Sequence, residues 1–157
     1  MDVKYVNPFL EALVSVLGNF GIAGIKRGSV LKKENMHVDM EITTVIGLIG
    51  VIRGNIAYSF SKATAMGIAS KMMAGAPVTD FDNIVKSAIG ELANMITGTA
   101  SGIISGIIDD KGGNFESTPP SIITGRDIYF IISSVPAIAI GMDTEYGKIE
   151  VNIGLEI

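Results

Sequence analysis

The feature that most constrains the fold of this chain is a long, weakly charged stretch in its second half. Residues 87–108 carry one charged side chain, Glu91, and are numerous enough to cross a bilayer as a helix. The same stretch also contains asparagine, serine, threonine and several glycine residues, which dilute its hydrophobicity. We therefore expect a helix of the protein core, running from Phe81 to about Ile108, and not a membrane span.

The composition is that of one compact α/β domain, spanning residues 1–157. The net charge of −4 and the lack of any Lys/Arg-rich run argue against nucleic-acid binding, which needs clustered positive charge. The chain has no cysteine, and its first residues include an acid and no basic segment. We therefore expect a cytoplasmic protein without a secretory signal. Because 48% of the residues are hydrophobic and 18% are charged, we also expect an interface between subunits.

Apolar spacing predicts a first helix over Asn7–Leu17, with Asn7 as its N-cap and Pro8 at its first helical position. Residues 26–34 are polar and are expected to form a loop or a short edge strand. Alternating or continuous apolar residues then predict three strands, with Gly54-Asn55 as the turn before the last of them. These strands are expected within residues 38–42, 45–52 and 55–60.

Ser61 is expected to cap a second helix that runs to about Met73 and is broken by residues 75–77. Thr79 or Asp80 is the expected cap of the long helix. After a polar loop over residues 109–117, the chain predicts four more strands, within 121–125, 127–134, 137–142 and 148–157.

The two halves of the chain are weakly similar, and this indicates an old duplication. Each half has a helix, then a short hydroxyl-rich segment (43–45 and 133–135), then apolar strands. Both helices also carry a polar residue and a glutamate four positions apart, Asn7 and Glu11 in the first and Ser87 and Glu91 in the second.

Three polar residues of the long helix, Ser87, Glu91 and Asn94, stand at positions i, i+4 and i+7 and therefore share one face. Such a stripe is commonly the solvated side of an amphipathic helix. It can also present a carboxylate and an amide to a partner. Asparagine within a helix costs a few tenths of a kcal/mol and returns nothing locally, which favours a functional role for Asn94.

Beyond Asn94 the same face continues with Gly98, Gly102 and Gly106. Each glycine within a helix costs roughly 0.5–1 kcal/mol relative to alanine. We therefore expect another backbone to approach the helix closely along these three positions.

The segment SAIGELANMITG, residues 87–98, resembles the signature of the CheC/CheX/FliY family of CheY-P phosphatases. The blocks VNPFLEAL, VIGLIGVIRGNIAYSFS and TPPSIITGRDI are also similar to the CheX members, so the resemblance covers nearly the whole chain. It implies a CheC-like fold of the α+β type. Two pseudo-repeated halves would form a mostly antiparallel sheet, with the long helices packed on one face.

CheC proteins carry two such helix motifs, and CheX proteins carry one. The equivalent residues of the first helix here are Asn7, Glu11 and Val14, and Val14 cannot position a water molecule. The chain therefore resembles the single-site branch, and not the flagellar switch protein FliM, whose domain lacks the catalytic residues. The loop before Pro119-Pro120 is longer than in the family, so we do not expect these prolines to contact the site.

The resemblance implies hydrolysis of the aspartyl phosphate of a CheY-type response regulator. Asn94 would orient the attacking water, and Glu91 would pair with the regulator's active-site lysine. Ser87 would position Glu91 or merely fill its helix turn. The Mg²⁺ ion would belong to the regulator. No metal or cofactor is expected in this chain, because His37 has no neighbouring histidine or cysteine and is expected to be structural.

The resemblance also implies a homodimer formed by edge-strand pairing. Three other functions remain open from the sequence. The chain could be a catalytically silent adaptor with the same fold, or a structural dimer whose polar stripe is only surface. It could also be a metabolic enzyme with a small-molecule pocket, although Gly47, Gly50 and Gly54 do not precede a helix as a nucleotide-binding loop would.

Overall fold

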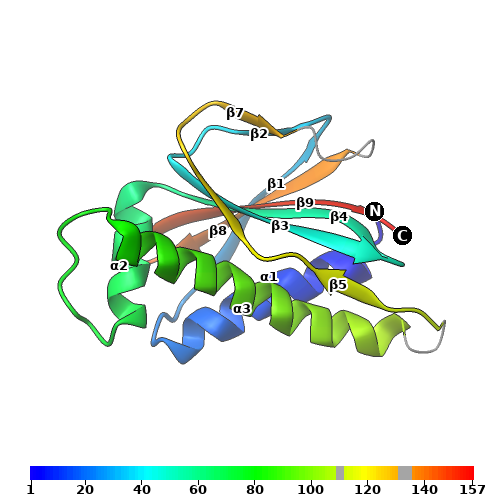
Figure 1. The fold of residues 1–157 in the computed structure, drawn as a ribbon, viewed down its shortest axis with the longest axis horizontal. Coiled ribbons are helices and arrows are strands. Elements are labelled where there is room, and N and C mark those ends of the chain that lie inside the picture. The colour runs from blue at the N-terminus through cyan, green and yellow to red at the C-terminus, as the bar shows by residue number, and fades with distance from the viewer. Residues whose placement is uncertain (109–111, 131–135) are drawn as a thin grey trace.

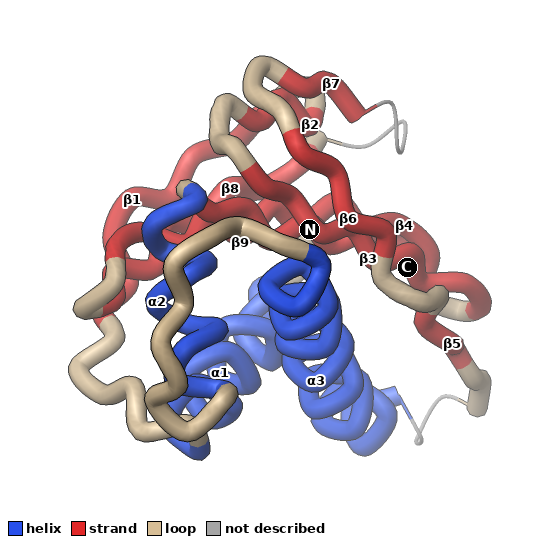
Figure 2. Tube along the Cα trace, turned by 60° about the vertical axis from the view of Figure 1, so that its left-hand side comes forward, coloured by secondary structure: helices blue, strands red, loops and turns tan. Residues whose placement is uncertain are grey.

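The structure is a computed structural model that describes residues 1–108, 112–130 and 136–157. Three helices cover one face of a seven-stranded sheet, and a small two-stranded sheet lies over the other face (Figures 1 and 2). Every strand pair is antiparallel. The helices are α1 (Val3–Asn19), α2 (Lys62–Met72) and α3 (Asn83–Ile108). The strands are β1 (Lys26–Lys33), β2 (Met36–Val38), β3 (Ile42–Gly50), β4 (Arg53–Phe60), β5 (Phe115–Ser117), β6 (Ser121–Thr124), β7 (Ile128–Phe130), β8 (Ala137–Thr144) and β9 (Gly147–Glu156).

The strand order shows the internal repeat that the sequence predicts. The larger sheet runs β1-β8-β9-β4-β3, and β5 and β6 both pair with the outer side of β3. The central pair is β4 with β9, flanked by β3 and β8, and these are flanked in turn by β6 and β1. The remaining pair, β2 with β7, forms the small sheet. α1 with β1–β4 and α3 with β6–β9 are therefore equivalent units, and α2 and β5 lie outside the repeat. The predicted α+β architecture is confirmed.

The core lies between the helices and the larger sheet. Side chains alternate along each strand, so every second residue faces the helices. On β9 these are Ile149, Val151, Ile153 and Leu155, all of which are buried. The helices α1 and α3 pack beside each other over this layer (Figure 2).

The first helix begins at Val3, five residues before its predicted first helical position at Pro8. Its N-cap is Asp2, whose carboxylate accepts the backbone N–H of Lys4 at 3.1 Å. Asn7 and Pro8 therefore lie inside the helix, and their prediction as its start was wrong. Proline removes one backbone hydrogen bond there. The helix continues through this position because Pro8 and Phe9 are buried in the core.

The turn between β3 and β4 also differs from the prediction. It falls at Val51 and Ile52, whereas Gly54 and Asn55 belong to β4. Gly54 has a φ of +138°, and a Cβ at this position would collide with the backbone carbonyl of Gly154. The glycine thus serves the close approach of β9 and not a turn.

Further boundaries are shifted. The predicted strand over 38–42 does not exist as one element, because β2 ends at Val38 in the small sheet and β3 begins at Ile42. Residues 26–34, read as a loop or a short edge strand, contain the eight-residue edge strand β1. Residues 115–117 of the predicted polar loop form β5. Residues 131–134 of one predicted strand, and the segment 133–135 of the repeat, lie outside the described residues.

The second helix is as predicted. Ser61 is its N-cap and accepts the backbone N–H of Thr64 at 3.1 Å. For α3 the predicted caps were wrong, since the cap is Asp82. Its carboxylate accepts the backbone N–H groups of Ile84 and Val85, at 3.0 and 3.1 Å.

Candidate functional site on the exposed face of helix α3

The long helix separates an apolar face from a polar face, as its sequence predicts. Its inner face is buried against the sheet and α1 and includes Val85, Ile89, Leu92, Ala93, Ile96, Ala100 and Ile104. Ser87, Glu91 and Asn94 are all exposed on the outer face. Side chains three or four positions apart on a helix have Cβ atoms about 5–6 Å apart, so one partner group can meet all three.

These polar groups have no partner within the part of the chain that the structure describes. Neither Glu91 nor Asn94 nor Ser87 makes a hydrogen bond or an ion pair there. The carboxylate of Glu91 and the amide of Asn94 therefore have no internal partner among the described residues, and both are exposed to solvent. They stand on an open helix surface, since three cavities of about 450–520 Å³ among the described residues are all lined by residues of other elements.

The three glycines beyond Asn94 are exposed, and the predicted close approach of another backbone was wrong. A Cβ built at Gly98, Gly102 or Gly106 meets no atom within 4 Å. The position of close approach is Gly90, on the buried side, where a Cβ would lie 3.1 Å from Cδ1 of Ile122. The three glycines therefore leave the exposed helix surface beyond Asn94 without side chains, and no strand packs against them.

The β6 strand lies alongside α3 near the polar stripe. Pro120, just before this strand, lies 3.8 Å from the Cβ position of Gly90. Gly90 directly precedes Glu91 in the helix. The structure thus brings Pro120 next to the helix turn that carries Glu91, which the longer loop before it had led us not to expect. Pro119 is exposed at the same place.

The equivalent face of α1 lacks the amide. Glu11 is exposed, as Glu91 is, but Val14 takes the place of Asn94 and is 43% exposed. An isopropyl group offers neither a hydrogen-bond donor nor an acceptor. Beside this face lies a cavity of about 520 Å³, lined by Asn7, Leu10, Glu11, Val14, Ser15, Arg27 and Met142. The internal repeat therefore supplies a second acid, but only α3 carries an amide three residues after it.

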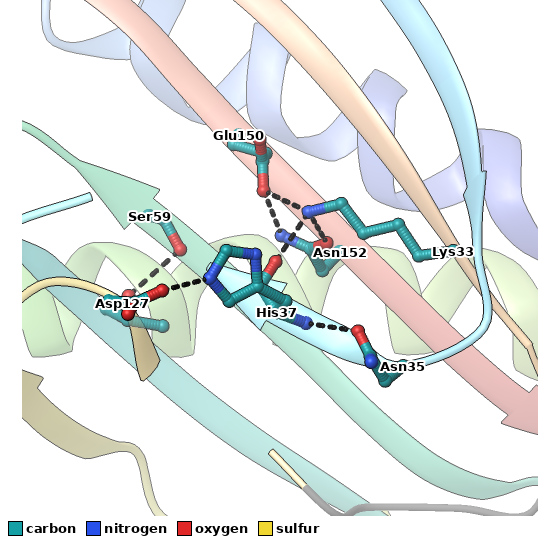
Figure 3. Close-up of polar contacts among 8 residues, drawn as sticks. Lys33, Asn35, His37, Ser59, Asp127, Glu150 and Asn152 are labelled. Carbon is teal, nitrogen blue, oxygen red and sulfur yellow. Dashed lines mark hydrogen bonds and ion pairs between the residues drawn. The ribbon is translucent and has the colours of Figure 1, made fainter. Parts of the chain in front are cut away.

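A polar network on the opposite face of the sheet was missed by the sequence analysis (Figure 3). The Lys33 ammonium donates to the carbonyl of His37 at 2.7 Å, to Glu150 at 2.8 Å and to Asn152 at 3.1 Å. Asn152 is fully buried and donates to Glu150 at 2.8 Å. The alternation of Glu150 and Asn152 with apolar residues on β9 was the available signal. Because these contacts join β1 and β9 to β2, we interpret the network as structural.

His37 is part of the small sheet, in line with the structural role expected from the sequence. Its Nε2 lies 2.6 Å from a carboxylate oxygen of Asp127, and its ring lies 4.4 Å from that of Tyr129. Among the described residues, no group of three His, Cys, Asp or Glu side chains could hold a metal ion. None of the helices within 1–108, 112–130 and 136–157 is long and apolar enough to cross a membrane.

This architecture, with an acid and an amide exposed on the longest helix, defines a protein of the CheC-like superfamily. A CheC-like superfamily protein from Shewanella sp. PV-4 has a TM-score of 0.86 and 28% identity, with each chain fully covered. CheX in the CheX–CheY–BeF₃–Mg²⁺ complex from Borrelia burgdorferi has a TM-score of 0.79 and 27% identity, with 98% of each chain covered.

The sequence comparisons narrow this class to one family. The family model described as "Chemotaxis phosphatase CheX" matches residues 42–142. The CheY-P phosphatase CheX of Thermotoga maritima is 32% identical over 130 residues, which are 82% of this chain and 80% of the relative. The chain therefore belongs to the CheX family of chemotaxis phosphatases, and the resemblance identified from its sequence is confirmed.

Proposed function

We propose that this protein dephosphorylates a phosphorylated CheY-type response regulator. The observation that supports this most strongly is the joint exposure of Glu91 and Asn94 on one face of α3, in a chain of the CheX family. The Thermotoga relative is a CheY-P phosphatase, and the Borrelia relative forms a complex with CheY, BeF₃ and Mg²⁺.

Hydrolysis of the aspartyl phosphate requires little from the enzyme beyond positioning a water molecule. An aspartyl phosphate is already reactive, so hydrolysis is accelerated mainly by holding a water molecule in line with the phosphorus. The side-chain amide of Asn94 can donate one hydrogen bond and accept another, which fixes the orientation of such a water. Asn94 is the water-positioning residue of this proposal.

Glu91 supplies the binding partner for a cation. One helix turn from Asn94, its carboxylate would pair with the lysine beside the regulator's phosphoaspartate. Ser87 lies one further turn away and would orient Glu91 from the same face. The Mg²⁺ ion belongs to the regulator in this proposal, and this chain contributes no metal ligand.

The shape of the helix surface suits insertion into a partner's active site. The glycines that follow Asn94 present no side chain, so a partner surface can approach the helix backbone there. The reaction requires a cytoplasmic location, since the proposed substrate is an intracellular signalling protein.

The test is the decay of a phosphorylated CheY-type regulator from the same organism, with and without the protein. We expect wild type to accelerate phosphate loss and the double variant Glu91→Ala/Asn94→Ala to lose that acceleration while remaining folded. Glu11→Ala is the matched control, because Glu11 is an exposed acid at the equivalent position of α1. It should retain the wild-type rate.

The same assay distinguishes the adaptor function. A wild-type protein that binds the phosphorylated regulator without changing its decay would be a catalytically silent adaptor. Loss of activity in Glu11→Ala, with Glu91→Ala/Asn94→Ala unaffected, would place the site on α1 and contradict the assignment to α3.

We also propose a homodimer formed through a sheet edge. The β1 strand is at one end of the larger sheet, and Val30 and Leu31 on it are 47% and 57% exposed. Two β1 strands paired antiparallel would bring together basic residues from both ends of the strand, and like charges opposite each other repel. Such a dimer should tighten as ionic strength rises. Light scattering over a salt series tests this, and a monomer at every salt concentration would contradict it.

A further inference from the structure

A buried pair of hydroxyl groups joins the proposed catalytic helix to the centre of the sheet. The phenol oxygen of Tyr58 on β4 lies 3.0 Å from Oγ1 of Thr97 on α3. Both side chains are completely buried. Tyr58 lies on the central β4–β9 pair, opposite Val151, so the hydroxyl contact ties α3 to a central part of the sheet.

This contact differs in kind from the other contacts of α3. Among the described residues, it is the one hydrogen bond that joins α3 to the sheet. The other inner-face residues near Thr97 are apolar, and two of them, Ala93 and Ala100, are small. Apolar contacts are non-directional. They bury the helix without fixing its rotation as narrowly as a hydrogen bond of defined geometry does.

Thr97 lies close to the exposed polar stripe along the chain. It follows Asn94 by three residues, which is less than one helical turn, and Glu91 by six. A rotation of α3 by about 10° would move an exposed side chain, roughly 6 Å from the helix axis, by about 1 Å. A misplacement of about 1 Å at a reacting group can lower a rate about 100-fold. The rotation of α3 is therefore a sensitive quantity for water positioning.

We infer that the Tyr58–Thr97 hydrogen bond fixes the rotation of α3 about its axis and thereby positions Asn94 and Glu91 for the reaction. Tyr58 and Thr97 are positioning residues, since neither reaches the surface. This inference rests on the proposed phosphatase function and adds two residues to it that the sequence analysis did not single out.

The state of the phenol fits this role. Burial raises the pKa of Tyr58, so the side chain stays protonated and able to donate to Thr97. The contact consequently needs no charge and no metal to persist.

The molecule contains a matched control for a merely structural effect. Oγ1 of Thr43 and Oγ of Ser59 form another hydroxyl pair at 3.0 Å, and both residues are completely buried. Ser59 is the neighbour of Tyr58 on β4 but points to the opposite face of the sheet. Removing its hydroxyl therefore disturbs a buried pair on the same strand without touching α3.

The experiment measures kcat and KM for dephosphorylation of the regulator by the full chain and four variants. Tyr58→Phe and Thr97→Val each remove one hydroxyl and keep the shape of the side chain. Thr97→Ser keeps the hydroxyl, and Ser59→Ala is the control. Circular dichroism and thermal unfolding establish that each variant is folded.

We expect Tyr58→Phe and Thr97→Val to lower kcat about tenfold or more with KM within about twofold of wild type. Thr97→Ser should recover most of the wild-type kcat. The double variant Tyr58→Phe/Thr97→Val should be no slower than either single variant, since both remove one contact. Ser59→Ala should lower the thermal midpoint and leave kcat unchanged.

Several outcomes overturn the inference. A wild-type kcat in folded Thr97→Val or Tyr58→Phe would do so, as would an equal loss of kcat in Ser59→Ala. An increase in KM alone would mean that the Tyr58–Thr97 pair serves binding of the regulator, and it would contradict the positioning of Asn94 and Glu91 for the reaction. If Tyr58→Phe fails to fold, the comparison of Thr97→Val with Thr97→Ser decides. A wild-type protein without phosphatase activity overturns the proposed function itself, and this inference with it.

Discussion

The exposed glycines of α3 allow a prediction whose sign separates two interpretations of the helix. Gly98, Gly102 and Gly106 lie within the helix, and a Cβ at each would meet no atom within 4 Å. Replacing a helical glycine by alanine in open space stabilises a protein by roughly 0.5–1 kcal/mol, mainly because the unfolded chain loses freedom. The triple variant Gly98→Ala/Gly102→Ala/Gly106→Ala should therefore gain about 1.5–3 kcal/mol in the free energy of unfolding.

For a chain of 157 residues, this gain in the free energy of unfolding corresponds to a measurable rise in Tm. At this size, 1 kcal/mol corresponds to about 2–4 °C in Tm, so the triple variant should melt roughly 3–12 °C higher than wild type. Urea unfolding, followed by circular dichroism at constant m-value, gives the free energy directly. Destabilisation by the triple variant would refute the reasoning, since it would mean that a backbone or a second subunit packs on these positions.

Three further predictions concern other parts of the molecule. Gly54→Ala should lower the free energy of unfolding, measured with urea, by more than about 2 kcal/mol, because the φ of Gly54 is +138° and a Cβ would collide with the carbonyl of Gly154. A neutral effect would contradict the close approach of β9. Lys33→Met should lower the free energy of unfolding by roughly 1–3 kcal/mol, because it removes the donor that Glu150 and the carbonyl of His37 share. A loss under about 0.5 kcal/mol, which is usual for surface changes, would show that the network is dispensable for stability. Because burial raises the pKa of Tyr58, the stability that its protonated form contributes is complete below about pH 10 and is lost as the pH rises further. The Tm of Tyr58→Phe should consequently fall less steeply than that of wild type above this pH, and parallel curves would contradict the buried phenol.

The sequence predicted the parts of the fold that depend on local patterns. The amphipathic spacing of α3, the cap at Ser61 and the alternation in β9 are local, and all three appear in the structure. The stripe of Ser87, Glu91 and Asn94 followed from helix periodicity alone, which fixes relative directions around a helix axis.

Some of the errors arise where a residue serves a distant contact. Gly54 looked like a turn residue, but it makes room for β9, which lies about a hundred residues later in the chain. The three glycines of α3 were expected to be packed, although they continue the face that carries the exposed Asn94. Helix periodicity favours exposure for Gly98, about one turn after Asn94, and is a better guide there than the cost of glycine in a helix. The Lys33 network was missed because its members come from three strands that only the sheet topology brings together.

The central claim is that Asn94 orients the attacking water. The most direct measurement is single-turnover decay of the phosphorylated regulator with saturating Asn94→Ala, together with its affinity for the BeF₃-activated regulator. We expect a rate about 100-fold or more below wild type, with the dissociation constant within about threefold of the wild-type value. A wild-type rate for Asn94→Ala at saturation would contradict this role of Asn94, because the water would then be positioned without the amide.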